Sequence, residues 1–224
     1  MNIAFIPVRG GSKSIPMKNI KIINGKPLVY WTTKAANDAG CIDKVIVATD
    51  SEEIKKTVVT FGLEKVEVYD RRAENAQDMS STESVMLEYI EKSNLDPNDN
   101  FFLIQATSPL LKSEHIDGMY KKFVETKVDS MFTGVREKQF HWIEDGDGVK
   151  PVNYDYKNRP RRQEFQGLIA ENGACYINSV KNIIHDKCRL SGKIGVYELP
   201  PETAYEIDEA KDFLIIENLM KANV

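Results

Sequence analysis

Short apolar segments alternate with longer amphipathic segments along the first two thirds of this chain. Four apolar segments have the Val, Ile, Leu and Phe content of buried strands and are bounded by turn-forming residues: residues 2–8, 44–49, 66–69 and 101–105. The segments between them carry apolar side chains at helical spacing: residues 28–39, 52–61 and 83–92. Strands that alternate with helices of this length predict a mainly parallel sheet covered by helices on both faces.

The pattern changes after a further helix at residues 114–127, which Ser113 is expected to cap, and a strand at 130–135. Residues 140–152, centred on Gly146-Asp147-Gly148, predict a hairpin, and a loop rich in Arg and Gln follows. The remaining expected elements are strands at 173–178 and 194–199 and a helix at 208–221 with Asp208 as its cap. We therefore expect one α/β domain over residues 1–224, with a Rossmann-like nucleotide-binding sheet and a small hairpin-bearing insertion at 137–170.

Composition excludes several classes of protein. The apolar run at residues 3–8 is far shorter than the roughly 18 residues that span a membrane, so a cytoplasmic protein is expected. A formal net charge of -4 argues against bulk nucleic-acid binding. Cys41, Cys175 and Cys188 form no CxxC pair, so neither a zinc site nor a disulfide framework is indicated, and we expect buried free thiols.

Basic residues concentrate where the first predicted strand ends. No Asp or Glu occurs before Asp38, although the chain as a whole is acidic. The loop Arg9-Gly10-Gly11-Ser12-Lys13, with Lys18 and Asn19 beyond it, combines glycines that let backbone N–H groups approach an anion with side chains that neutralise charge. It matches neither the Walker A nor the dinucleotide motif. The pattern indicates a triphosphate site, and a solvated Gly-Ser turn with surface lysines is the alternative.

Several further segments extend this loop into a recognisable series. They are PVRGGSKSIPMKN at 7–19, Arg71 with Ala73-Glu74 and Asp78, QATSPL at 105–110, RPRRQ at 159–163, ENG at 171–173 and Glu206-Ile207-Asp208. In these segments and their order the chain resembles the acylneuraminate cytidylyltransferases, which make CMP-sialic acids from CTP. Residues 139–176 look more like the animal members than like several bacterial ones.

The resemblance implies a role for each matching residue. Catalytic roles fall to Arg9, Lys18 and Asp208. The expected nucleotide contacts are Arg9, Gly10, Gly11, Ser12, Lys13, Lys18, Asn19, Arg71 and Thr82. The expected contacts to the acceptor sugar are Gln105, Thr107, Ser108, Arg162 and Tyr176, with Arg162 suited to bind a carboxylate through two hydrogen bonds.

Most of these residues also allow a structural role. Gln105 can satisfy loop backbone at a strand end, Thr82 can cap a helix, and Tyr176 can be a core aromatic. Arg71 can pair with Asp70 or Glu74 at the surface. The basic run at residues 157–162 also fits a nuclear-import address.

Glu206 and Asp208 are spaced so that both carboxylates point to one side of an extended segment, where they can hold a hard cation. Phosphoryl transfer requires such a cation, and Mg²⁺ is the expected cofactor. In the family both positions are usually Asp, so the longer Glu206 leaves direct or water-mediated ligation open. Asp208 also fits a simple helix cap.

The expected reaction joins CTP and a nonulosonic acid, a nine-carbon 2-keto sugar acid, to give the CMP-sugar and pyrophosphate. Alternatives are another keto-sugar acid, such as legionaminate, a deaminated sialate or an eight-carbon acid, a sugar 1-phosphate, or a nucleotide-binding module without turnover. The resemblance further implies a homodimer in which the insertion reaches the partner's sugar site, with residues 140–142 and 189–193 as candidate contacts. No nucleic-acid or membrane partner is expected.

Overall fold

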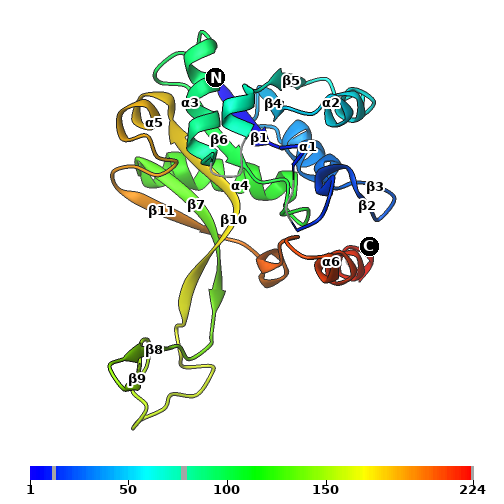
Figure 1. The fold of residues 1–224 in the computed structure, drawn as a ribbon. Coiled ribbons are helices and arrows are strands. Elements are labelled where there is room, and N and C mark those ends of the chain that lie inside the picture. Colours follow the sequence, from blue (N-terminus) through cyan, green and yellow to red (C-terminus); the bar gives the residue numbers. More distant parts are fainter. Residues whose placement is uncertain (12–13, 77–79, 223–224) are drawn as a thin grey trace.

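A seven-stranded sheet forms the centre of the computed structural model, which describes residues 1–11, 14–76 and 80–222 (Figure 1). Its strands are β1 (Asn2–Pro7), β4 (Lys44–Thr49), β5 (Val66–Asp70), β6 (Asn100–Ile104), β7 (Ser130–Glu137), β10 (Leu168–Ser179) and β11 (Ile194–Glu198). They lie in the order β11-β7-β10-β6-β1-β4-β5. Only β10 runs antiparallel to its neighbours β6 and β7. The predicted mainly parallel sheet is therefore confirmed.

Helices cover both faces of this sheet, as predicted. They are α1 (Leu28–Asp38), α2 (Glu52–Val59), α3 (Thr82–Lys92), α4 (Ser113–Thr126) and α5 (Val180–Asp186). Helix α6 (Ala210–Ala222) packs instead in a separate apolar cluster with Ile15, Leu28 and Leu110. Apolar residues of α1, α2 and α4 share one buried cluster with Ala4 and Ile6 of β1. Those of α3 and α5 share a second cluster with Ile3 and Phe5. Alternate β1 side chains thus enter opposite cores, as the two-residue period of a strand requires.

The order of the strands positions the functional site. β1 pairs in parallel with β4 on one side and with β6 on the other. The chain therefore leaves β1 towards β4 and β5, and later returns to the other side of β1 at β6. The position between β1 and β6, where the order of the strands reverses, is called a topological switch point. The loops that follow the two strands turn away from each other there, and open α/β sheets bind ligands in the crevice between such loops.

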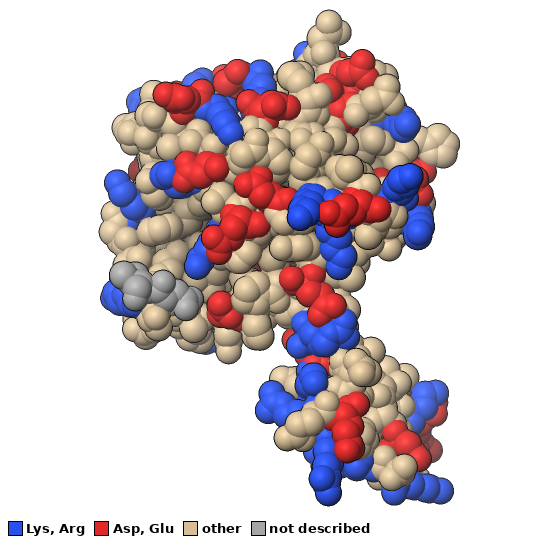
Figure 2. Space-filling view, turned by 180° about the vertical axis from the view of Figure 1, so that it is seen from behind, with Lys and Arg blue, Asp and Glu red and all other residues tan. Residues whose placement is uncertain are grey.

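An arm projects from the sheet between β7 and β10 (Figure 1). It contains the predicted hairpin, formed by β8 (Trp142–Asp145) and β9 (Gly148–Pro151). Gly146 has φ +63° in the turn between them, a conformation that favours glycine. Lys and Arg side chains lie over much of this arm in the view from behind (Figure 2). Its role in dimerisation remains a prediction.

Several local predictions need correction. Helix α5 was not predicted, because its seven residues give too short a periodic signal. Ser113 is the first residue of α4, and Lys112 occupies the cap position. Asp208 does not cap α6: that helix starts at Ala210, and the Asp212 carboxylate accepts the backbone N–H groups of Asp208 and Glu209.

Short elements complete the described chain. They are the 3₁₀ helices η1 (Lys18–Ile20), η2 (Ala73–Ala76) and η3 (Pro201–Ala204) and the two-residue strands β2 (Ile22–Ile23) and β3 (Lys26–Pro27). The three cysteines are free, but only Cys175 is buried, and Cys188 is exposed. Among the described residues, no helix has both the length and the apolar character that crossing a membrane requires.

Phe5 offers a test of the two-layer core, because its side chain is fully buried and its ring centroid lies 5.3 Å from those of Tyr89 and Phe101. Truncation to Ala leaves a cavity between β1, β6 and α3. We expect Phe5→Ala to lower the free energy of unfolding by about 3–5 kcal/mol. The matched control Val124→Ala removes an exposed side chain of α4 and should change it by less than about 0.5 kcal/mol. Urea titrations measure both, and equal effects would contradict the assigned core.

Candidate active site

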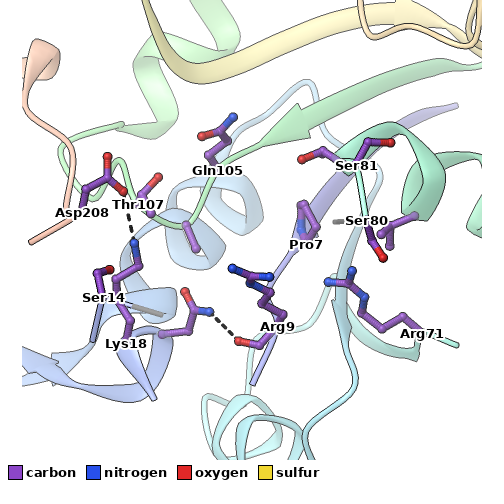
Figure 3. Close-up of a pocket in the computed structure, with 14 residues that line it drawn as sticks. Pro7, Arg9, Ser14, Lys18, Arg71, Ser80, Ser81, Gln105, Thr107 and Asp208 are labelled. Carbon is purple, nitrogen blue, oxygen red and sulfur yellow. Dashed lines mark hydrogen bonds and ion pairs between the residues drawn. The ribbon is translucent and has the colours of Figure 1, made fainter. Parts of the chain in front are cut away.

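A polar cavity of about 450 Å³ opens at the carboxyl ends of β1 and β6 (Figure 3). Its lining comes from the β1 end, the following basic loop, the start of α3, the β6 end and the segment before α6. The lining residues are Pro7, Arg9, Ser14, Lys18, Asn19, Arg71, Ser80, Ser81, Thr82, Val85, Gln105, Ala106, Thr107 and Asp208. The cavity at the switch point is therefore lined by half of the candidate site residues that were named from the sequence.

The loop after β1 is held on two sides. The buried Asn19 donates from Nδ2 to the Arg9 backbone oxygen at 3.0 Å, and the Gly10 N–H donates to Asp50 Oδ1 at 3.0 Å. A Cβ on Gly10 would lie 2.9 Å from the Ser51 Cβ, so only glycine allows this close approach. These contacts fix the backbone from which the Arg9 guanidinium points into the cavity (Figure 3).

Lys18 connects this loop to the segment that precedes α6. Its Nζ donates to the Ile207 backbone oxygen at 2.7 Å and to Asp208 Oδ1 at 3.3 Å. The Lys18 side chain is only 12% exposed, whereas that of Asp208 is 71% exposed. A largely buried cation thus faces an exposed carboxylate, and both residues line the cavity.

Glu206 lies against the β10 strand rather than in the cavity lining. A Cβ on Gly173, which has φ +66°, would lie 2.5 Å from Glu206 Oε1 and 3.3 Å from Gln105 Oε1. Burial raises the pKa of the Glu206 carboxyl to about 7, and the negative charge of Asp208 adds to this shift. The two carboxylates therefore interact electrostatically, as do two carboxylates that share a cation. Among the described residues, no group of three or more His, Cys, Asp or Glu gathers in a metal-binding cluster.

Arg71 and Thr82 form the opposite wall. Arg71 donates from its guanidinium to the Asn75 backbone oxygen, and it pairs with neither Asp70 nor Glu74. Asp70 instead accepts from Lys55 at 2.9 Å. Burial lowers the pKa of the Arg71 guanidinium, which remains charged at neutral pH. Thr82 does not cap α3, because Ser81 occupies the cap and its hydroxyl accepts the Ser84 N–H at 3.1 Å.

The predicted sugar contacts divide into two groups. Gln105 and Thr107 line the cavity. Ser108 and Tyr176 are 2% and 3% exposed and lie outside its lining. The Tyr176 hydroxyl donates to the Glu171 carboxylate. Its position therefore agrees with the alternative that Tyr176 is a core aromatic.

Arg162 lies on the arm, away from the cavity at the switch point. It lines a separate cavity of about 510 Å³ together with Lys138, Gln139, Phe140, Arg159 and Pro160. Gly10 and Gly11 adjoin the main cavity without lining it. The predicted contacts Ser12 and Lys13, and Asp78 of the matching series, lie outside the described residues.

Ser14, Ser80 and Ser81 line the cavity but were not predicted to do so. A cap signal was available for Ser81, since Ser-Ser-Thr directly precedes the periodic pattern of α3. For Ser80, only the fold reveals that the start of α3 faces the end of β1.

Comparison with known proteins agrees with this geometry. Residues 3–197 match the family model described as "Cytidylyltransferase". The N-acylneuraminate cytidylyltransferase of Oncorhynchus mykiss is 37% identical over 219 residues, which cover 96% of this chain and 49% of that protein. The pseudaminic acid cytidylyltransferase of Campylobacter jejuni is 28% identical, with coverage of 99% and 97%.

The chain thus spans about half the length of the first of these relatives. Among solved structures, CMP:2-keto-3-deoxy-manno-octonic acid synthetase complexed with CTP has the same fold, with a TM-score of 0.70 at 16% identity and 100% coverage of both chains. The family match extends from the second residue of β1 to the penultimate residue of β11, and so includes part or all of every strand of the central sheet. The chain belongs to the cytidylyltransferase family.

Proposed function

We propose that this chain transfers the cytidylyl group of CTP to a nonulosonic acid of the N-acylneuraminate type, giving the CMP-sugar and pyrophosphate. One observation carries the proposal: Arg9, Lys18 and Arg71 surround a single polar cavity at the β1/β6 switch point. Three cations around one cavity suit a triphosphate. The names of the relatives, N-acylneuraminate and pseudaminic acid cytidylyltransferase, support the acceptor class.

In the proposed reaction the anomeric hydroxyl of the sugar acid attacks the α-phosphorus. The new bond joins that oxygen to phosphorus, the bond from the α-phosphorus to the bridging oxygen breaks, and pyrophosphate leaves. The hydroxyl proton passes to solvent. Arg9 and Lys18 would stabilise the negative charge that moves onto the leaving group, while Arg71 and Thr82 hold the nucleoside side.

Gln105 and Thr107 are proposed to face the acceptor, because they end the strand on the other side of the switch point. Arg162 lines the cavity on the arm and does not line the cavity at the switch point. We propose that it acts in a homodimer, where the arm of one protomer meets the sugar acid bound by its partner. A cytoplasmic location also remains a prediction.

Glu206 and Asp208 are proposed to hold Mg²⁺. The two carboxylates offer oxygen ligands that fit a hard cation. Burial, together with the negative charge of Asp208, raises the pKa of Glu206, and a bound cation would favour the charged carboxylate. The bound ion would supply charge neutralisation at the triphosphate. Gly173 leaves room for the Glu206 carboxylate at this position.

The proposed function is tested by pyrophosphate release from CTP and Mg²⁺ in the presence of different acceptors. N-acetylneuraminate, pseudaminate, legionaminate and the eight-carbon keto-deoxy acid are compared with a control without sugar acid. We expect release that depends on a nine-carbon acid. Pyrophosphate release with the eight-carbon acid alone would refute the acceptor class. No release with any of the four acids, despite CTP binding, would favour a nucleotide-binding module without turnover.

Arg9→Ala and Lys18→Ala test the assignment of the phosphate site. Each removes a cation at the cavity, so we expect kcat to fall by about a hundredfold or more. Lys34→Ala is the matched control, because Lys34 belongs to the same acid-free stretch but pairs with Asp38 on the surface of α1. Steady-state kinetics with saturating CTP measure the effect. Wild-type turnover in both cavity variants would refute the assignment.

Glu206→Gln tests the metal site, since it keeps the size of the side chain and removes its charge. We expect the Mg²⁺ concentration at half-maximal rate to rise by at least about tenfold, a loss typical even for outer-shell partners of a metal. Glu206→Asp should stay close to wild type, because the family tolerates Asp there. Glu202→Gln, in η3 of the same segment, provides the control. An unchanged Mg²⁺ dependence in Glu206→Gln would move the metal site elsewhere.

A further inference from the structure

Glu88 has a buried carboxylate that does not line the cavity at the switch point. Glu88 belongs to α3, and its side chain is only 1% exposed. Its Oε1 accepts the Tyr69 hydroxyl at 2.8 Å and the Arg72 backbone N–H at 2.9 Å, and its Oε2 accepts Asn75 Nδ2 at 2.6 Å. Lys92 Nζ approaches at 3.4 Å. One carboxylate thus accepts hydrogen bonds from β5, from the turn that follows β5 and from its own helix.

These donors decide the charge of Glu88. Burial opposes ionisation, but hydrogen bonds from Asn75, from the Arg72 backbone and from Tyr69 hold the pKa of the carboxyl below its ordinary value. The group is therefore charged at neutral pH. A buried charge is tolerated only while its hydrogen bonds persist. The conformation of the turn at 72–75 is consequently coupled to Glu88.

The same turn holds Arg71 at the cavity wall. The Arg71 guanidinium donates to the backbone oxygen of Asn75, the residue whose side chain Glu88 binds. The Arg71 backbone N–H donates to the Thr49 oxygen at 3.1 Å, which fixes the start of the turn. From this position the Arg71 side chain points toward the Arg9 side of the cavity (Figure 3). A chain of contacts therefore runs from Glu88 through Asn75 to Arg71.

We propose that Glu88 is a positioning residue for nucleotide binding: it fixes the turn at 72–75 and thereby the Arg71 guanidinium at the cavity. The inference rests on the proposed function, since it assigns the Arg71 wall to CTP. Loss of Glu88 should weaken the binding of CTP and leave the binding of the sugar acid unchanged. Gln105 and Thr107, which are proposed to face the sugar acid, follow β6. Among the described residues, Glu88 forms no side-chain hydrogen bond to β6.

The test combines two disruptive variants with two controls. Glu88→Met fills a similar volume but accepts no hydrogen bond, and Asn75→Ala removes the link to Glu88 from the partly exposed turn. Glu88→Gln keeps an oxygen that accepts from Arg72 and Tyr69. Its amide nitrogen can donate to the Asn75 side-chain oxygen if the Asn75 amide group rotates by 180°. Glu91→Gln changes an exposed glutamate on the same helix. Calorimetry gives the Kd of CTP without sugar acid, kinetics give KM for each substrate, and thermal unfolding confirms that each variant folds.

We expect Glu88→Met and Asn75→Ala to raise the Kd and KM of CTP about tenfold, as for the loss of one charge-assisted contact, with the KM of the sugar acid nearly unchanged. Glu88→Gln and Glu91→Gln should bind CTP like wild type. If Glu88→Met does not fold, Asn75→Ala still decides the question.

Two results would overturn the inference: a folded Asn75→Ala that binds CTP like wild type, or equal rises in KM for both substrates. A wild-type chain that binds CTP but transfers nothing would refute the proposed reaction, and the Kd values would still test Glu88. A wild-type chain that binds no CTP would overturn both.

Discussion

The parallel pairing of β1 with both β4 and β6 is the constraint on which the rest of the site depends. Parallel strands end at the same edge of a sheet, and the loops after β1 and β6 must part because their next elements lie on opposite sides. Arg9 follows one of these strands and Gln105 follows the other. The cavity thus brings together residues nearly a hundred positions apart in the sequence.

Contacts between distant segments then give this crevice its charge pattern. Lys18 reaches the Ile207 oxygen and Asp208, so the segment before α6 closes one side of the cavity. Asp50 accepts the Gly10 N–H, and its negative charge partly offsets the burial that lowers the pKa of Arg71, so one carboxylate acts on two parts of the site. The cations outnumber the carboxylates in the lining, which suits a polyanionic ligand.

The sequence predicted the sheet, most of its helices and the cavity residues Arg9, Lys18, Asn19, Arg71, Thr82, Gln105, Thr107 and Asp208. Strand and helix periods and the basic glycine loop carry local signals, which explains this success. The resemblance to a known family supplied Arg71, Thr82 and Gln105, because no local pattern links them to a cavity. Tyr176 and Asp208 show what local patterns cannot resolve. The Tyr176 hydroxyl donates to Glu171, and Asp208 does not cap α6 but donates its own backbone N–H to Asp212 of that helix.

Two glutamates show how their surroundings give different properties to one residue type. Hydrogen-bond donors surround Glu88, and its pKa falls, so it serves as a fixed charge within the protein. Glu206 has no hydrogen-bond donor to its carboxylate among the described residues, and burial together with Asp208 raises its pKa. The charge of Lys18 only partly offsets this shift, so a bound cation would further stabilise the charged carboxylate. That difference is the physical reason for assigning Glu88 to the turn that holds Arg71 and Glu206 to a cation.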